Sequence, residues 1–145
     1  MKNLLLMCVL LSGLFLTSGC ENNEILLSEK KLNNELTGSW KIVAPRPVSD
    51  YDETWTFANG VVTISSVNGT KNIAVTGNYS VDTKFSKAFI RLSGFNFPPT
   101  ERLSSGFTAA DLNRKWTLVQ LDEKVLYIST TDDKGAIRSI ECVKM

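Results

Sequence analysis

The feature that most restricts the fold is an Asn-Gly dipeptide placed between two segments in which apolar and polar residues alternate. Asn59-Gly60 separates Glu53–Ala58 from Val61–Val67, and Asn-Gly is the pair that best suits a two-residue type I′ hairpin turn. Four apolar residues then share one face of the sheet in two opposed pairs: Phe57 with Val62, and Trp55 with Ile64. The pattern therefore predicts an antiparallel hairpin of defined register.

A second Asn-Gly pair, Asn68-Gly69, predicts that the sheet continues into a third strand. With this pair as the turn, Ile64 opposes Ile73, so the apolar face extends across three strands. The alternation continues beyond Gly77, which indicates one long strand over 72–82. A glycine inside a strand indicates a bend or bulge where the sheet curls.

Five further segments alternate in the same way, and a short amphipathic segment precedes them. The predicted strands cover 39–44, 87–93, 115–121, 124–131 and 136–144. The amphipathic segment, 25–36, predicts a helix that stops before Gly38. About eight antiparallel strands in meander order, with no helices between them, predict an all-β fold closed into a barrel, because closure removes exposed sheet edges. An open β-sandwich is the alternative.

The connection over 94–114 is unusually long for a meander, and connections of this length are often functional. It carries three phenylalanines: Phe95, Phe97 and Phe107. Exposed phenylalanines would mark a lid or a contact surface for a partner, whereas the alternative is that the rings plug one end of the fold. Thr108 and Asp111 form a capping-box pattern, which predicts a single helical turn inside the connection.

Residues 1–19 have the composition of a secretion signal peptide. Lys2 precedes an apolar run over 4–16, and Thr17-Ser18-Gly19 lead to Cys20. At about 1.5 Å per residue this run spans only about 20 Å, short of the ~30 Å hydrocarbon core of a membrane. The signal and its cysteine resemble those of bacterial lipoproteins, although Thr17 stands where that pattern favours leucine.

This resemblance implies cleavage before Cys20 and attachment of lipid to Cys20. Residues 1–19 would then be the lipoprotein signal peptide, 20–24 the lipidated tether and 25–145 one domain. The lipid would hold the chain permanently at a membrane, and we expect an outer-membrane lipoprotein of the cell envelope. The acidic residues in 21–24 resemble a surface-export signal, with a solvated tether as the alternative.

Composition excludes several classes of function. The chain has no histidine, which removes Ser-His-Asp and Cys-His catalysis and the common zinc sites. Cys8 leaves with the signal and Cys20 would carry lipid, so Cys142 has no partner for an internal disulfide. Loss of Lys2 with the signal leaves fifteen basic and fifteen acidic residues. This balance, without any basic tract, argues against nucleic acid as a partner.

The acidic residues lie mostly in turn-like stretches, 50–53, 122–123 and 132–133, which indicates solvated loop charges. We therefore predict a protein that is not an enzyme and that uses no metal or cofactor.

The region over 32–145 resembles the lipocalin-like domains of bacterial lipoproteins. A short helix leads into Leu36-Thr37-Gly38-Ser39-Trp40, and Gly38-x-Trp40 is the first-strand motif of that family. The resemblance implies that Trp40 packs across the closed end of the barrel against an arginine from a late strand. Arg138 is the best-placed candidate for that structural role, and Arg114 is the alternative.

Two functions are compatible with these patterns. The first is binding of a small apolar or amphipathic ligand, such as a lipid or fatty acid, inside the barrel. Aromatic residues are the candidates for its lining: Trp55, Phe57, Tyr79 and Trp116 as inward rings, and Tyr127, whose face the pattern leaves open. The same rings would otherwise simply fill the core. The second function is a protein-interaction or inhibitor module of the envelope, which would contact its partner through the 94–114 connection.

Overall fold

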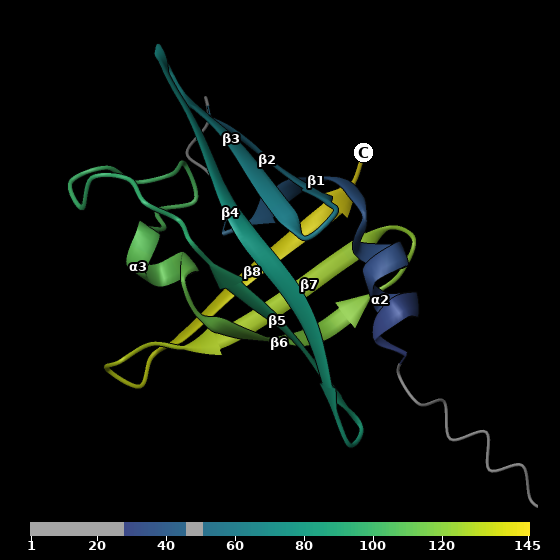
Figure 1. The fold of residues 1–145 in the computed structure, drawn as a ribbon. Coiled ribbons are helices and arrows are strands. Elements are labelled where there is room, and N and C mark those ends of the chain that lie inside the picture. The colour runs from purple at the N-terminus through teal and green to yellow at the C-terminus, as the bar shows by residue number, and fades with distance from the viewer. Residues whose placement is uncertain (1–27, 46–50) are drawn as a thin grey trace, which may run out of the picture.

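The computed structural model describes residues 28–45 and 51–145. Eight antiparallel strands follow one another around a closed barrel in chain order, and the last strand pairs with the first (Figure 1). The strands are β1 (Gly38–Ala44), β2 (Tyr51–Ala58), β3 (Val61–Asn68), β4 (Lys71–Lys84), β5 (Lys87–Ser93), β6 (Lys115–Leu121), β7 (Val125–Thr131) and β8 (Ile137–Lys144). The described residues also form two helices, α2 (Glu29–Leu36) and α3 (Ala109–Leu112). The predicted barrel with a short helix before it is confirmed, and the sandwich alternative is wrong.

Several predicted features lie outside the described residues. They are the signal peptide over 1–19, the lipidation site Cys20, the tether over 20–24 and the first part of the predicted helix. The described part of that helix ends at Leu36, before Gly38, as predicted. Gly38 then opens β1 with φ of 125°, a backbone conformation that residues with a Cβ atom rarely adopt.

The first hairpin has the register that its turn predicts. Ala58 pairs with Val61 across Asn59-Gly60, so Phe57 opposes Val62 and Trp55 opposes Ile64. Both turn residues have positive φ, 52° for Asn59 and 78° for Gly60, as a type I′ turn requires. Local sequence and tertiary packing therefore select the same pairing.

The second turn lies one residue later than predicted. Asn68 pairs with Lys71, so the turn residues are Gly69-Thr70 and Ile64 opposes Val75 instead of Ile73. Gly69 has φ of 56° at the first turn position, the place where a type II′ turn favours glycine. A shift of the turn by one residue moves the pairing by two residues, so every side chain keeps its face of the sheet.

The later strands agree closely with their predicted ranges. β5 and β6 have the predicted bounds, whereas β7 and β8 each begin one residue later. The reason is a side-chain turn before each strand: Asp122 accepts hydrogen bonds from the N–H groups of Lys124 and Val125, and Asp132 accepts one from Ala136 N–H. These bonds hold the first predicted strand residue within the turn.

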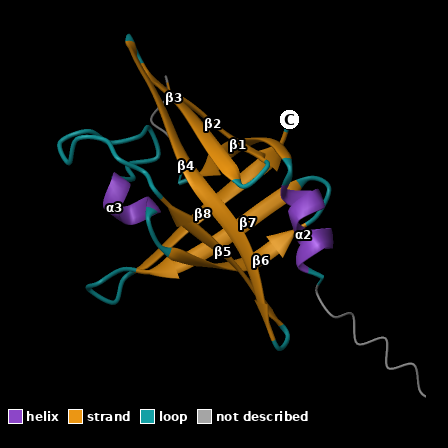
Figure 2. Cartoon of the chain, in the orientation of Figure 1, coloured by secondary structure: helices purple, strands orange, loops and turns teal. Residues whose placement is uncertain are grey.

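The two helices lie at opposite ends of the barrel (Figure 2). We call these the α2 end, where β1 starts and β8 finishes, and the α3 end, which carries the 94–114 connection. Each helix accepts a hydrogen bond from the tryptophan four residues after its end. Trp40 Nε1 donates to the Leu36 carbonyl at 2.7 Å, and Trp116 Nε1 donates to the Leu112 carbonyl at 3.3 Å. Both buried indole N–H groups are thereby satisfied.

Candidate functional site

The predicted ligand-lining aromatics lie inside the barrel, but they fill it. Trp55, Phe57 and Trp116 have no exposed surface and Tyr79 is 8% exposed. Phe57 makes an edge-to-face contact with Tyr79, with ring centres 5.1 Å apart, and its ring centre lies 6.2 Å from that of Trp55. A side chain with no exposed surface has no water-sized space beside it. These residues are therefore brought together as a packed core in this conformation.

Tyr127 is the exception among those candidates. It is half-buried, while its neighbours in β7, Leu126 and Ile128, are fully buried. Because side chains alternate across a strand, Tyr127 lies on the outer face of the barrel. The sequence left its face open, and on the outer face it does not line the interior.

The phenylalanines of the 94–114 connection are buried, so the exposure expected of a partner surface is wrong for them. Phe95, Phe97 and Phe107 belong to the same hydrophobic core as the strand residues, together with Leu103 of the connection. Phe107 packs edge-on against Trp116, with ring centres 5.7 Å apart. The alternative prediction, that the rings plug one end of the fold, describes their arrangement.

Gly77 makes room for one of these rings. A Cβ atom built on Gly77 would lie 2.6 Å from Phe95 Cε2 and 2.8 Å from two further ring atoms. Gly77 lies within β4, as predicted, and the absence of its side chain lets Phe95 enter the barrel. The glycine therefore serves close packing between a strand and the connection.

A buried carboxylate, which the sequence analysis missed, joins the connection to the barrel. Glu53 is 1% exposed. Its Oε1 accepts hydrogen bonds from Trp55 Nε1 at 2.8 Å and from the Ser105 hydroxyl at 2.9 Å. Its Oε2 accepts bonds from the Ser104 hydroxyl and from the Ser105 N–H, each at 2.9 Å. The prediction that acidic residues here are solvated loop charges is wrong for Glu53.

Ser66 of β3 completes this cluster, which we call the Glu53 cluster: Glu53, Ser66, Ser104 and Ser105. The Ser66 hydroxyl accepts a hydrogen bond from Ser104 N–H at 2.7 Å and lies 2.9 Å from the Ser104 hydroxyl. Every close contact of the Glu53 oxygens is a donor, which suits an acceptor-only carboxylate. One feature of the sequence pointed to a buried Glu53. Glu53 alternates with Trp55 and Phe57 along the same strand, so its side chain lies on the inward face with theirs.

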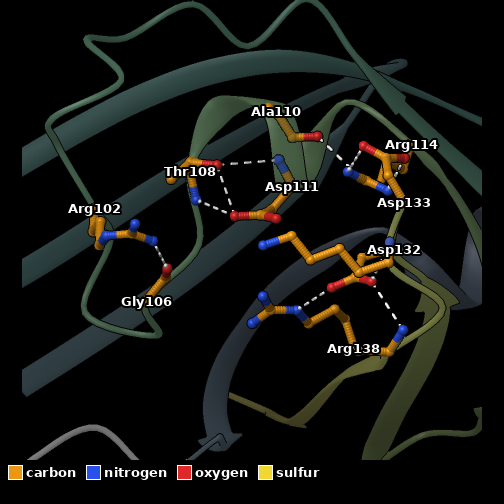
Figure 3. A network of polar contacts seen from close by, with 11 residues as sticks. Arg102, Gly106, Thr108, Ala110, Asp111, Arg114, Asp132, Asp133 and Arg138 are labelled. Atoms are coloured by element: carbon orange, nitrogen blue, oxygen red, sulfur yellow. Dashed lines mark hydrogen bonds and ion pairs between the residues drawn. The ribbon is translucent and has the colours of Figure 1, made fainter.

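A second polar network ties α3 to the turn between β7 and β8 (Figure 3). The Arg114 guanidinium binds both carboxylate oxygens of Asp133, at 3.0 and 3.1 Å, and its Nε donates to the Ala110 carbonyl. Within α3, Thr108 and Asp111 form the predicted capping box. Bidentate pairing fixes the orientation of both partners, so the connection is held at a second point.

Hydrogen bonding and nearby cations set the pKa of Asp111. Burial by itself raises this pKa, but hydrogen bonds from the Thr108 hydroxyl and N–H outweigh it, with help from the Arg138 and Arg114 cations. The net result is a pKa below the ordinary aspartate value. Asp111 therefore stays ionised and keeps the cap closed to lower pH than a free carboxyl would.

Arg138 does not pack against Trp40, so its predicted structural role is wrong. Its Nε lies 3.3 Å from Asp132 in the turn at the α3 end, far along the strand from Trp40. Lys144 occupies the predicted place instead, because it pairs with Trp40 across β1 and β8. Trp40 itself is fully buried at the α2 end, as predicted. A cation from a late strand therefore does lie beside Trp40, but it is Lys144, six residues further along β8 than Arg138.

The described residues provide little for acid–base or nucleophilic chemistry. Burial raises the pKa of the Cys142 thiol well above its usual range, and the Glu53 and Glu141 carboxylates add to that effect. Such a thiol is inert as a nucleophile. Across 28–45 and 51–145, no group of three or more acidic or cysteine side chains could hold a metal ion. In the same ranges, no helix has both the length and the apolar character needed to cross a membrane.

The polar contacts at the α3 end make the 94–114 connection the candidate functional site. The Glu53 cluster, the capping box and the Arg114–Asp133 pair all act on it, and five of its apolar side chains, including Leu112 of α3, enter the core. Comparison with known proteins adds no relative: no family model, no curated protein and no solved structure matches the chain. The site is accordingly defined by its own geometry, as a segment held by polar contacts and buried rings that covers one end of a filled barrel.

Proposed function

We propose that this chain is a bacterial lipoprotein, anchored by lipid on Cys20, that acts without catalysis as a protein-interaction module of the cell envelope. Its contact surface would be the exposed part of the 94–114 connection. The observation that carries this proposal is the filled barrel, since Trp55, Phe57 and Trp116 have no exposed surface. A packed interior leaves the outside of the molecule as the place to bind another molecule.

The shape of the connection supports this role. Pro98, Pro99 and Thr100 are exposed, and buried Phe97 and Leu103 flank them on either side. The segment thus presents a short exposed stretch between two anchored points. Binding through a segment that is already ordered avoids much of the entropy lost when a flexible loop is immobilised.

The absence of catalysis is supported by the lack of histidine in the chain and by the state of the buried carboxylate of Glu53. Four close donors occupy both oxygens of Glu53. A general acid or base must reach the proton of a substrate, and Glu53 has no free oxygen directed at open space.

Lipid attachment is tested by growing cells with a labelled fatty acid and following the label on the protein. Wild-type chain should carry the label and stay with the membrane fraction, whereas Cys20→Ser should carry none and be released. Equal labelling of both forms would exclude Cys20 as the anchor.

The interaction role is tested by photocrosslinking in cells. A photoreactive residue at position 100 should capture one reproducible protein. The matched control is position 85 at the α2 end, because Phe85 is 90% exposed but distant from the connection. Capture of nothing reproducible at position 100, or of the same set of proteins at both positions, would contradict the proposal.

A second candidate function is the binding of a small apolar ligand. The observation that favours it is the packing of Phe107, from the connection, against Trp116 of the barrel. If the connection lifted away from the barrel, Phe107 would leave an apolar site beside Trp116 that a lipid chain could fill. Native mass spectrometry of unlipidated protein mixed with extracted lipids tests it. A bound lipid whose affinity falls when Trp116 is changed to Ala would favour this candidate, and the absence of bound lipid would exclude it.

A further inference from the structure

β4 extends beyond its partner on one side. It pairs with β3 over Lys71–Asn78, but with β5 only over Asn78–Lys84, because β5 ends opposite Asn78. Figure 1 shows the β3–β4 hairpin projecting past the end of β5. Among the described residues, no strand pairs with 71–77 on the side away from β3. This stretch of β4 is therefore a sheet edge within an otherwise closed barrel.

One hydrogen bond shows to which side each backbone N–H and C=O group of this edge points. Tyr79 N–H donates to the Gly60 carbonyl at 2.8 Å, on the β3 side. Backbone groups alternate sides along a strand, so Asn72, Ala74 and Thr76 direct their N–H and C=O groups away from β3. All three residues are exposed, and within the described part of the chain no hydrogen bond uses these groups. The edge thus presents three donors and three acceptors in regular order.

A groove runs along this edge. It has a volume of about 420 Å³ and lies between 71–76 of β4 and the first part of the connection, Asn96, Phe97, Pro98 and Glu101. The Lys71 ammonium lies 3.1 Å from Glu101 Oε1 across the groove. Six residues of a strand extend about 20 Å, which is the length of a short extended peptide.

We propose that the partner binds as an extended peptide, which adds a strand to the free edge of β4 and lies in this groove. This inference rests on the proposed interaction role and names the chemistry of the partner. Backbone donors and acceptors that alternate at strand spacing are matched by another extended chain. Phe97 and Pro98 line the side of the groove opposite β4. This arrangement favours a single extended chain over the edge strand of a second barrel, because that edge strand would bring its own neighbouring strand into the groove.

The side chains along the edge indicate which peptide fits. Ile73 and Val75 face inward and are buried or half-buried, while Asn72, Ala74 and Thr76 face outward. Neighbouring side chains on the same face of a sheet contact each other. The peptide therefore carries apolar residues at alternate positions beside Ile73 and Phe97, and polar residues between them.

Ala74→Pro tests the edge directly. Proline removes the N–H that faces the groove and leaves the bonds to β3, so the barrel should still fold, and thermal unfolding and circular dichroism check this. Ala74→Val is the matched control, because it enlarges the side chain and keeps the N–H. The probe is a phage-displayed library of random peptides, panned on the chain from residue 20 carrying Cys20→Ser.

Selected peptides should bind Ala74→Pro roughly tenfold or more weakly, the effect of one lost backbone hydrogen bond, and Ala74→Val about as well as wild type. Bound peptide should also slow amide exchange at 72, 74 and 76 in the wild-type chain, a readout that needs no variant. Failure to select any peptide, or equal binding to Ala74→Pro, overturns the proposal. Concentration-dependent protection of these amides without peptide also overturns it, because the occupant is then a second copy of the chain.

The crosslinking experiment separates the two proposals. Capture at position 100 that persists in Ala74→Pro supports the interaction role and overturns strand addition. No capture by the wild-type chain overturns the interaction role, and strand addition falls with it, because no partner then engages this face of the protein.

Discussion

The ammonium nitrogen of Lys144 lies 4.8 Å from the centre of the Trp40 ring and donates a 2.8 Å hydrogen bond to the Glu35 carbonyl. One side chain from the last strand thus joins the first strand and the end of α2. Gly38 leaves space for it, because a Cβ atom there would lie 3.2 Å from Lys144 Cε. A cation beside the last carbonyls of a helix also meets the negative end of the helix dipole. Gly38, Trp40 and Lys144 together close the α2 end.

Replacing Lys144 with methionine should destabilise the fold by about 1–2 kcal/mol, because it removes a cation–π contact and a charged hydrogen bond but keeps the apolar stem. Urea unfolding measures the change. Lys41→Met is the control, because the exposed Lys41–Asp52 ion pair should contribute only a few tenths of a kcal/mol. Equal losses in the two variants would show that the contact with Trp40 contributes nothing.

Glu53→Gln should destabilise the fold by about 2–3 kcal/mol, because the amide turns an N–H₂ group toward buried donors. The change should act first on the connection, so amide exchange at Ser105 should speed up more than exchange in the strands. The control is Glu101→Gln, which alters a half-exposed ion pair with Lys71. Exchange at Ser105 that stays at the wild-type rate in Glu53→Gln would contradict the assigned role.

Gly77→Ala should cost about 1–3 kcal/mol through overpacking, because the new methyl group meets the Phe95 ring. Phe95→Leu in the same chain should recover part of this loss, since leucine vacates the ring position. A double-mutant cycle by urea unfolding measures the coupling between the two sites. Strictly additive losses would mean that Phe95 does not occupy the space above Gly77.

Asp111 should make stability depend on pH in acid. Its pKa is lower in the folded chain than the ordinary value, so its contribution is complete above about pH 4 and is lost as pH falls through the folded pKa. The difference in unfolding free energy between wild type and Asp111→Asn should therefore shrink as pH falls below 4. Taking this difference removes the contributions of Asp122 and Asp132, whose pKa values are also lowered. A constant difference would contradict the capping interaction.

Features that depend on neighbouring residues could be read from the sequence. The turn at Asn59-Gly60, the capping box of Thr108 with Asp111 and the bounds of β5 are all encoded within short segments. The shift of the second turn to Gly69-Thr70 was harder to foresee. Both pairings place the same side chains in the core, so the hydrophobic pattern does not distinguish them.

Features that depend on distant residues could not be read in this way. Glu53 meets Ser105 across 52 positions, and Lys144 meets Glu35 across 109. Periodicity assigns the faces of strands, but it says nothing about where an irregular connection folds. For that reason the burial of Phe95, Phe97 and Phe107 stayed open until their packing was known.

The sequence by itself determined an eight-stranded meander, its inward faces and its first turn, because alternation and turn chemistry act over a few residues. Only the tertiary structure decided that the barrel is filled, that the connection plugs its α3 end and that β4 keeps a free edge. Those outcomes depend on the volume left between packed side chains and on how far β5 runs beside β4. Volume and strand length relative to a neighbour are properties of the assembled chain.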